Sequence, residues 1–190
     1  VVSNTEETKE SFVYLLNADE LRYSERINPD AQILVGNVVF RQDSMYMYCD
    51  SALFFQEANS FNAYHNIRVE QGDTLFLYGD SLFYDGNTRI LKIRDNVRIE
   101  NTTMVLLTDS LNYERDAELG YFFAGGTLLE EDNTLTADYG QFHTPTKMAT
   151  FMKDVFLESV DYSLSSDTLL YNTDLHTAYF VSPTEIISDE

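Results

Sequence analysis

Six aspartates recur along this chain at a nearly constant spacing. They are Asp19, Asp50, Asp80, Asp109, Asp138 and Asp167, and the steps between them are 31, 30, 29, 29 and 29 residues. A column of carboxylates can bind calcium, and two facing carboxylates can act as acid and base in glycoside hydrolysis. The glycine-rich nonapeptides of calcium-binding β-rolls are absent, however. The acids also recur with the repeat, whereas an active site is normally a single departure from it. We therefore favour a structural role over a metal column.

The remaining residues with catalytic potential form no recognisable site. His65, His143 and His176 fall at different offsets in the repeat, without a nearby Cys or Ser in a nucleophile motif. No phosphate-binding glycine loop is present, and the glycines at 125–126 are better explained as a bulge. The acids at 130–132 align with turn positions of other repeats, so we expect a solvated loop there. The sequence predicts no enzyme, no metal and no cofactor.

The residues around each aspartate repeat as well, and they define the elements that position it. Three residues before it stand Leu16, Met47, Leu77, Leu106, Leu135 and Leu164. Two residues after it stand Leu21, Ala52, Leu82, Leu111, Gly140 and Leu169. Four residues after it stand the aromatic residues Tyr23, Phe54, Tyr84, Tyr113, Phe142 and Tyr171. The sequence thus contains six copies of one unit.

A second apolar block lies half a period away. Its anchors are Val38, Ile67, Val97, Thr127 and Val155, and four residues before them lie Leu34, Ala63, Ile93, Phe123 and Phe151. The residues Asn37, Asn66, Asn96, Gly126 and Asp154 interrupt this block, and these types tolerate left-handed or bulged backbone.

The apolar pattern predicts strands rather than helices, because β-branched and aromatic residues alternate with polar ones. The apolar column before the aspartate lies an odd number of residues from it, and those after it lie an even number away. In a regular strand these two sets would therefore face opposite sides of the sheet. If all of them point inward, each strand must bulge or turn a corner at the aspartate, whose carboxylate can then accept backbone N–H bonds. In a stack of such layers, we expect the aromatic column to form a ladder and the aspartates to face one another.

Composition limits the partners of the protein. The chain has 190 residues, is 44% hydrophobic and carries a net charge of −20, which disfavours nucleic acid and anionic membrane surfaces. A single cysteine, Cys49, excludes an intrachain disulfide. We interpret residues 1–11 as a polar tail without a signal-peptide core, and 12–190 as one repeat domain. No apolar run approaches the roughly 20 residues of a membrane span.

The stretches "GNVVFRQDSMYMYCDSALFF" and "GGTLLEEDNTLTADYGQF" resemble the OstA-like (organic solvent tolerance) family, which includes LptA, the periplasmic bridge protein of lipopolysaccharide transport. The elements "VGNVVF" at 35–40, "LNADELRY" at 16–23 and "LTADYGQF" at 135–142 carry the likeness. It extends over about residues 12–187. The sequence departs from the family in its acidity and in having Asp-Ser where the family often has a basic residue after Asp.

The resemblance implies an open β-jellyroll of stacked V-shaped layers, also called a β-taco, with a repeat of about 29 residues. It implies a periplasmic location, with any signal already removed, and acyl chains of lipopolysaccharide or a related glycolipid in an apolar crease. The lipid-binding residues implied are Leu16, Met47, Leu77, Leu106, Leu135, Leu164, Phe54, Tyr84, Tyr113, Phe142, Tyr171, Ile67 and Val97. A structural or carbohydrate-binding β-solenoid, with aromatic residues on an outer face, is the alternative.

The two ends of the stack are expected to dock onto other chains. The last unit, "SPTEIISDE" at 182–190, begins where another second block should stand and then stops. We therefore expect a piece of a longer protein, or an edge that pairs with another copy or with another OstA-fold protein. The N-terminal edge at 11–23 would be the complementary face. Pro183 weakens this expectation, because it removes one backbone donor from the C-terminal edge.

Overall fold

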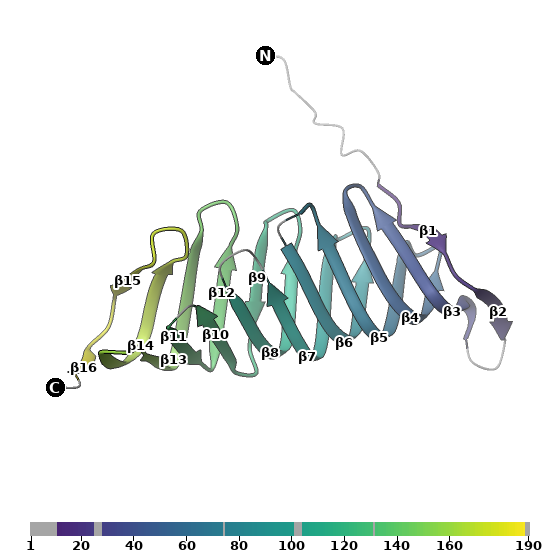
Figure 1. Ribbon diagram of the computed structural model, residues 1–190. Helices are drawn as coiled ribbons and strands as arrows, with labels where there is room; N and C mark the ends of the chain where they lie inside the picture. The colour runs from purple at the N-terminus through teal and green to yellow at the C-terminus, as the bar shows by residue number, and fades with distance from the viewer. Residues whose placement is uncertain (1–10, 25–27, 74, 101–103, 131, 189–190) are drawn as a thin grey trace, which may run out of the picture.

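A computed structural model describes residues 11–24, 28–73, 75–100, 104–130 and 132–188. These residues form sixteen β-strands in one antiparallel sheet, which confirms the all-β prediction. Within the same ranges, no helix is long and apolar enough to cross a membrane. Figure 1 shows the strands side by side along a trough, with the N-terminal strands at the right and the C-terminal strands at the left.

The strands are β1 (Tyr14–Asn17), β2 (Glu20–Ser24), β3 (Asn28–Gln42), β4 (Met45–Phe55), β5 (Ser60–Gln71), β6 (Leu75–Asp85), β7 (Ile90–Glu100), β8 (Val105–Glu114), β9 (Leu119–Phe122), β10 (Gly126–Glu130), β11 (Asn133–Ala137), β12 (Tyr139–His143), β13 (Met148–Glu158), β14 (Tyr162–Asn172), β15 (Thr177–Phe180) and β16 (Thr184–Ser188).

The sheet is a meander folded into two walls. Strands β3 to β7 each pair with the next strand in the chain along most of their length. Elsewhere two short strands replace one long one: β8 pairs with β10 in its first half and with β9 in its second half. We call the half of the sheet that contains β1, β10, β11 and β16 the first wall. The half that contains β2, β9, β12 and β15 is the second wall.

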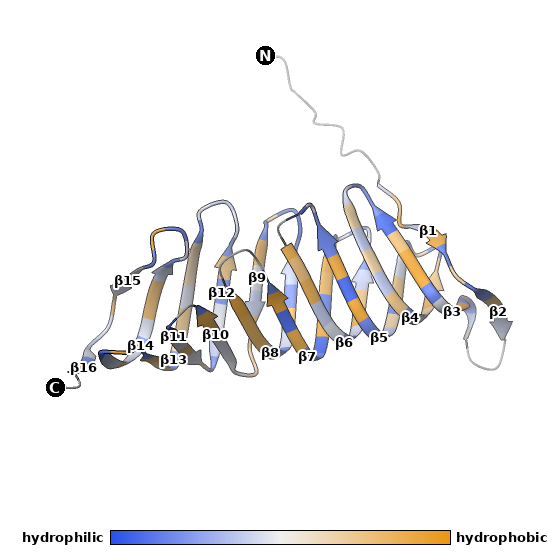
Figure 2. Cartoon of the chain, in the orientation of Figure 1, coloured by the Kyte–Doolittle hydropathy of each residue, from blue (hydrophilic) through white to orange (hydrophobic). Residues whose placement is uncertain are grey.

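The walls meet at a corner, and the corner lies at the repeated aspartate, as predicted. Along β4 the burial pattern changes parity at Asp50: Cys49 and Ala52 are both buried, while Asp50 and Ser51 between them face outward. The pairing of β4 with β5 shifts register between Tyr48 and Ser51. Each strand therefore turns its apolar residues toward the same interior on both sides of the corner. Figure 2 shows the underlying alternation of apolar and polar residues along the strands.

The backbone opposite each aspartate is left-handed. The residues with positive φ include Asn37 (46°), Asn66 (51°), Asn96 (51°) and Asp154 (48°). Asparagine and aspartate tolerate this conformation better than most residues, because their short side chains hydrogen-bond locally. The second block thus supplies the bend on one strand where the aspartate supplies it on the next.

The aspartates do not face one another, which corrects our expectation. Because the sheet is a meander, successive aspartates lie two strands apart, and a residue of the second block stands between them. The amide of Asn66 donates to Asp50 over 2.6 Å, and that of Asn96 donates to Asp80 over 2.5 Å. The Asn96 N–H donates to Asp109 Oδ1 over 3.4 Å, as we expected, but the shorter bonds to Asp50 and Asp80 come from side-chain amides. This alternation places an amide between the carboxylates from Asp19 to Asp109, whereas at the C-terminal end Asp154 itself stands between the corners of Asp138 and Asp167.

The aromatic column is interleaved in the same way. Phe61 on β5 is the register partner of both Phe54 and Tyr84, so it stands between these two members of the column. The ring centroids of Phe61 and Tyr84 are 5.6 Å apart, a favourable tilted contact. The aromatic ladder is present, but its members alternate between the strands that carry an aspartate and the strands between them.

One stretch of the second block was misaligned by one residue. Phe122 and Leu128 are buried, whereas Phe123 is exposed, so the inward series passes through Phe122 and Gly126 rather than Phe123 and Thr127. Glycine is required beside this ring. A Cβ on Gly126 would lie 2.6 Å from the Phe122 ring, and one on Gly140 would lie 2.2 Å from it. The bulge predicted at 125–126 corresponds to Gly125, with a φ of 78°.

The corner generates the first testable prediction. Replacing Asn96 with Gly keeps the left-handed backbone but removes the bond to Asp80, and we expect a loss of about 1 kcal/mol in the free energy of unfolding. Replacing Asn96 with Ala also forces a Cβ into the left-handed region, for a total loss of about 2 kcal/mol. Urea unfolding measures both. Equal losses for the two variants would show that the backbone conformation contributes nothing.

Candidate functional site: the interior between the walls

The interior between the walls is lined by the predicted apolar columns. Eleven of the thirteen predicted lipid-binding side chains are buried: Met47, Phe54, Ile67, Leu77, Tyr84, Val97, Leu106, Tyr113, Leu135, Leu164 and Tyr171. Phe142 is half-buried and packs against the same interior. Nearly all of the predicted columns thus converge on one space, whether or not that space takes a lipid.

Leu16 is the exception, and its predicted inward placement is wrong. Its side chain is 51% exposed. Leu15 takes the inward position instead: it is the register partner of the buried Phe40, and it packs against the core. The pairing of β1 with β3 shifts between Leu15 and Asn17, and this irregularity turns Leu16 outward.

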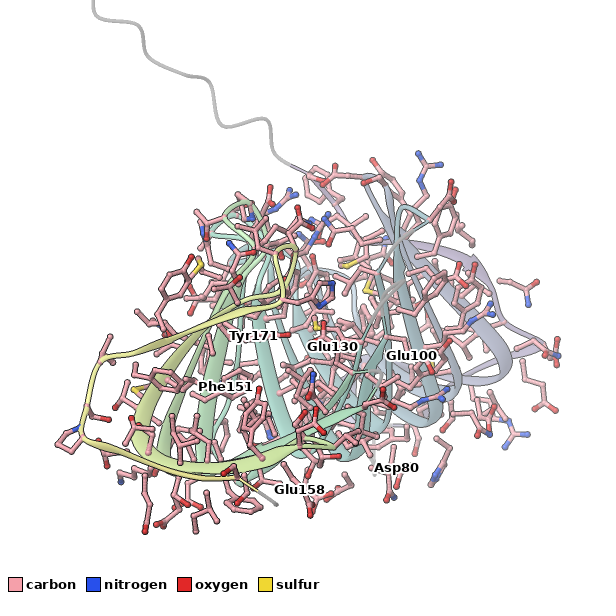
Figure 3. All side chains as sticks on the ribbon, turned by 60° about the vertical axis from the view of Figure 1, so that its left-hand side comes forward. Asp80, Glu100, Glu130, Phe151, Glu158 and Tyr171 are labelled. Atoms are coloured by element: carbon pink, nitrogen blue, oxygen red, sulfur yellow. The ribbon has the colours of Figure 1, made fainter. Side chains whose placement is uncertain are left out.

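The interior consists of two clusters with a small cavity where they meet. The first cluster spans Val13 to Tyr113 and the second spans Met104 to Tyr171, with Ile99 packed against both. A cavity of about 50 Å³ lies at the junction, lined by apolar residues including Leu77, Leu106 and Phe142. Phe151, which also lines it, is labelled inside the fold in Figure 3. This volume holds a water molecule or two rather than an acyl chain. The crease is closed in this structure.

A polar cluster ties the outer rims of the two walls together near the N-terminal end. We call it the rim clasp, made of Gln42, Asp43, Tyr84, Arg89 and Arg115. The buried Arg115 guanidinium donates to Gln42 Oε1 over 3.1 Å and to the Tyr84 hydroxyl over 2.8 Å. The Tyr84 hydroxyl also donates to Gln42 Oε1. Asp43 Oδ2 lies 2.8 Å from Arg89 and 3.5 Å from Arg115. The first wall contributes Gln42 and Asp43, and the second contributes the rest.

The start of the described chain lies across the same rim. The Gln42 side chain donates to the Ser11 carbonyl over 2.7 Å, and the Val13 N–H donates to Asn59 Oδ1 over 2.7 Å. The Val13 side chain inserts into the first cluster. Ser11, which we assigned to the tail, therefore contacts the domain, and its hydroxyl donates to Asp43 over 2.6 Å. Residues 1–10 lie outside the described residues.

A second clasp joins the rims near the C-terminal end. The Tyr171 hydroxyl on the second wall donates to Glu130 Oε2 on the first, and His176 Nδ1 lies 2.8 Å from Glu130 Oε1. Figure 3 shows Tyr171 and Glu130 beside each other in the interior. Glu130 is only 5% exposed, so the solvated loop predicted at 130–132 is wrong at its first residue. Glu130 ends β10 facing inward, because the side-chain alternation from Leu128 continues to it.

Comparison with known proteins assigns the family. The family model described as OstA-like protein matches residues 10–167. The chain belongs to the OstA-like family. This OstA-like chain is also similar in fold to LptH from Pseudomonas aeruginosa, described as the LptA-homologous periplasmic component of the lipopolysaccharide transport device. The TM-score is 0.54 at 9% identity, over 61% of this chain and 95% of LptH, which confirms the predicted jellyroll. No curated protein matches the sequence significantly.

Both ends of this OstA-like fold display inward-facing apolar residues. At the N-terminal end, Leu21 and Tyr23 on β2 are 48% and 70% exposed. Tyr23 lines a hollow of about 1010 Å³ together with Phe12 and Tyr14. At the C-terminal end, Phe180 and Ile186 are the register partners of the buried Leu169 and Leu164, and are 46% and 58% exposed. The apolar interior thus reaches both ends of the trough.

The rim clasp generates the second prediction. The Ser11 hydrogen bond, together with Arg89 and Arg115, lowers the pKa of Asp43 below its usual value, although burial opposes the shift. A lowered pKa stabilises the fold above the unfolded-state value of about 3.9, and this contribution is lost as the pH falls through the folded-state pKa. We expect Asp43→Asn to lower the urea midpoint by a constant amount from pH 7 to about 5, and by progressively less below about 4. A difference from wild type that grows on acidification would contradict this assignment.

Proposed function

We propose that this OstA-like protein is a periplasmic lipid-binding scaffold that carries acyl chains of lipopolysaccharide, or of a related glycolipid, toward the outer membrane. The observation that carries the proposal is the apolar interior that continues through every layer and reaches both ends of the trough. Membership of the OstA-like family supports it, as does the likeness in fold to a periplasmic component of lipopolysaccharide transport. The role requires binding and guidance, and no bond is made or broken.

The repeat suits a lipid that must move. Each layer offers the same kinds of side chain at the same positions, so an acyl chain that shifts by one layer exchanges one set of contacts for an equivalent set. Apolar contact is non-directional, and it contributes about 0.8 kcal/mol per buried CH₂, or about 8 kcal/mol for a ten-carbon segment. In the described part of the chain, the columns that line the two clusters are apolar, and the buried polar groups Gln42, Arg115 and Glu130 lie in the clasps at the rims.

Lipid entry requires the walls to separate, since the interior is closed. The walls are held together by apolar contacts and by the two clasps. An entering acyl chain replaces wall-to-wall apolar contacts with wall-to-lipid contacts, so the apolar term changes little overall. The clasps are different, because their hydrogen bonds have no counterpart on an acyl chain. We infer that entry begins at the cavity between the two clusters, which Leu106 lines and which lies between the clasps along the stack.

The third prediction tests the crease with a matched pair of variants. Leu106 faces the cavity, whereas its neighbour Leu107 faces outward on the same strand. We expect Leu106→Gln to weaken binding of lipopolysaccharide or of a fluorescent fatty acid at least tenfold, because a buried amide without partners opposes apolar contact. Leu107→Gln should bind like wild type. Fluorescence titration measures the affinity.

Folding is checked separately for both variants by urea unfolding, because Leu106→Gln also lowers stability. If a folded Leu106→Gln protein binds lipid as tightly as wild type, the crease is not the lipid site.

We further propose that the ends of the trough dock onto other OstA-fold proteins or onto a second copy. Among the described residues, β2 and the β15–β16 arm each have a sheet neighbour on one side only. Such edges are templates for pairing with another chain. The exposed Leu21 and Tyr23 at one end, and Phe180 and Ile186 at the other, would then join into one continuous apolar floor.

The fourth prediction tests this docking. We expect the light-scattering mass of the full chain to rise with protein concentration, and the rise to disappear for a chain truncated after Val181, which lacks β16. Ile186→Asp, which keeps the strand but places a charge on its inward face, should reduce association as well. A strict monomer at millimolar concentration for all three proteins would rule out self-association through these edges.

A further inference from the structure

A groove runs along the outer face of the first wall, beside the corners and on the opposite side of the sheet from the lipid crease. It consists of two hollows of about 510 and 700 Å³, which share Tyr78 and Asn96 and therefore follow one another along the stack. Both are lined by a mixture of aromatic, basic, acidic and amide side chains. The proposed lipid crease accounts for none of these groups.

One side of the groove is a row of stacked tyrosine and arginine side chains. Tyr48, Arg68, Tyr78 and Arg98 are successive register partners on β4, β5, β6 and β7. The Arg68 guanidinium lies 4.3 Å from the centroid of the Tyr48 ring, and that of Arg98 lies 4.6 Å from the centroid of the Tyr78 ring. The flat groups are thus held in a fixed orientation by cation–π contact.

A carboxylate two residues further along the same strand pairs with each guanidinium. Arg68 NH1 lies 3.3 Å from Glu70, and Arg98 NH1 lies 2.6 Å from Glu100. A guanidinium has five N–H donors in a rigid fork, so one contact through NH1 leaves it able to donate to a ligand. The arginines are therefore positioned donors rather than freely moving surface charges.

The opposite side of the groove is the row of corners. The pairs Asp50–Asn66 and Asp80–Asn96 line it, with amide-to-carboxylate distances of 2.6 and 2.5 Å. In both pairs the amide donates to Oδ2, and a carboxylate offers several acceptor positions. The strand pairs β4–β5 and β6–β7 thus each present one Tyr–Arg stack and one carboxylate–amide pair to the groove.

We propose that this groove binds a linear, uncharged glycan with β-1,4-linked sugars. Sugar hydroxyls both donate and accept, so they match a groove that offers guanidinium donors on one side and carboxylate acceptors on the other. The C–H face of a sugar ring packs against flat aromatic and guanidinium groups. A polyanion is disfavoured by the net charge of −20. Because Glu70 and Glu100 pair with the two arginines, the groove offers hydrogen-bonding groups rather than a row of unpaired cations.

The spacing of the groove fits a repeating glycan. Tyr48 and Tyr78 lie on strands β4 and β6, two strand spacings apart, or about 9.5 Å. This is close to the length of one β-1,4-linked disaccharide in its extended form. An extended chain laid along the stack would therefore meet two equivalent Tyr–Arg stacks one disaccharide apart, and the contacts with both would add.

Titration with defined oligosaccharides tests the proposal. Calorimetry with cellohexaose and chitohexaose is expected to show binding that strengthens from the disaccharide to the hexasaccharide. Maltohexaose, whose α-1,4 linkages curl the chain, should bind at least tenfold more weakly. No heat of binding for either β-1,4-linked hexasaccharide at millimolar ligand would overturn the proposal, as would equal binding of maltohexaose.

A matched pair of tyrosine variants locates the site. Tyr78 lines both hollows, whereas Tyr46 lies on the outer side of the same wall beneath Arg41, at 5.7 Å, and lines neither hollow. We expect Tyr78→Ala to weaken hexasaccharide binding about tenfold, and Tyr46→Ala to change it less than twofold. Equal loss in both variants, at equal urea midpoints, would place binding elsewhere. Tyr78→Ala should leave fatty-acid binding unchanged, which separates this site from the lipid crease.

Discussion

The hydrogen bond between a corner aspartate and the asparagine of the next strand is the contact on which the rest of the structure depends. A strand that simply continued straight would present its apolar residues to opposite faces on either side of Asp80. The bend, with left-handed backbone at Asn96, reverses that parity and brings both halves of the strand toward one interior. In the N-terminal half of the sheet, asparagines separate the corner carboxylates, and each of Asp19, Asp50 and Asp80 accepts a hydrogen bond from one of them. Two walls, one interior and an outer groove all follow from this single bend.

Much of this arrangement could be predicted from the sequence, because it is encoded locally. The aspartate spacing, the inward aromatic residues and the change of parity can each be recognised within about ten residues. The errors arose where register depends on a neighbouring strand. Leu15 rather than Leu16 faces Phe40, and Phe122 rather than Phe123 fills the space beside two glycines. In both cases two alignments of the repeat that differ by one residue fit the sequence pattern equally well. Only the packing against the neighbouring strand decides which residue faces inward.

The clasps could not be predicted from local pattern at all. Arg115 contacts Gln42 across 73 residues of sequence, and Tyr171 reaches Glu130 across 41. Gln42 and Glu130 both lie at the outer ends of first-wall strands. In each strand the alternation of side chains makes this last residue face inward, although it is polar. The repeat identified that position as a turn, since polarity usually indicates solvent. These polar groups can be buried only because side chains from the opposite wall hydrogen-bond to them. The sequence pattern of one strand does not identify such a partner.

The location of the clasps also decides how the fold can be both stable and able to open. If apolar contact alone held the walls together, they would resist separation equally along the whole interior. An entering lipid would then have to replace wall-to-wall contacts at every layer. Instead the strongest directional bonds lie at two points on the rim, with the apolar cavity between them along the stack. Hydrogen bonds weaken steeply with small changes in distance and angle, whereas apolar contact is non-directional. For the proposed lipid-binding role, this arrangement favours entry by release of one clasp, since a small rotation of one wall would break its hydrogen bonds while most of the interior stayed covered.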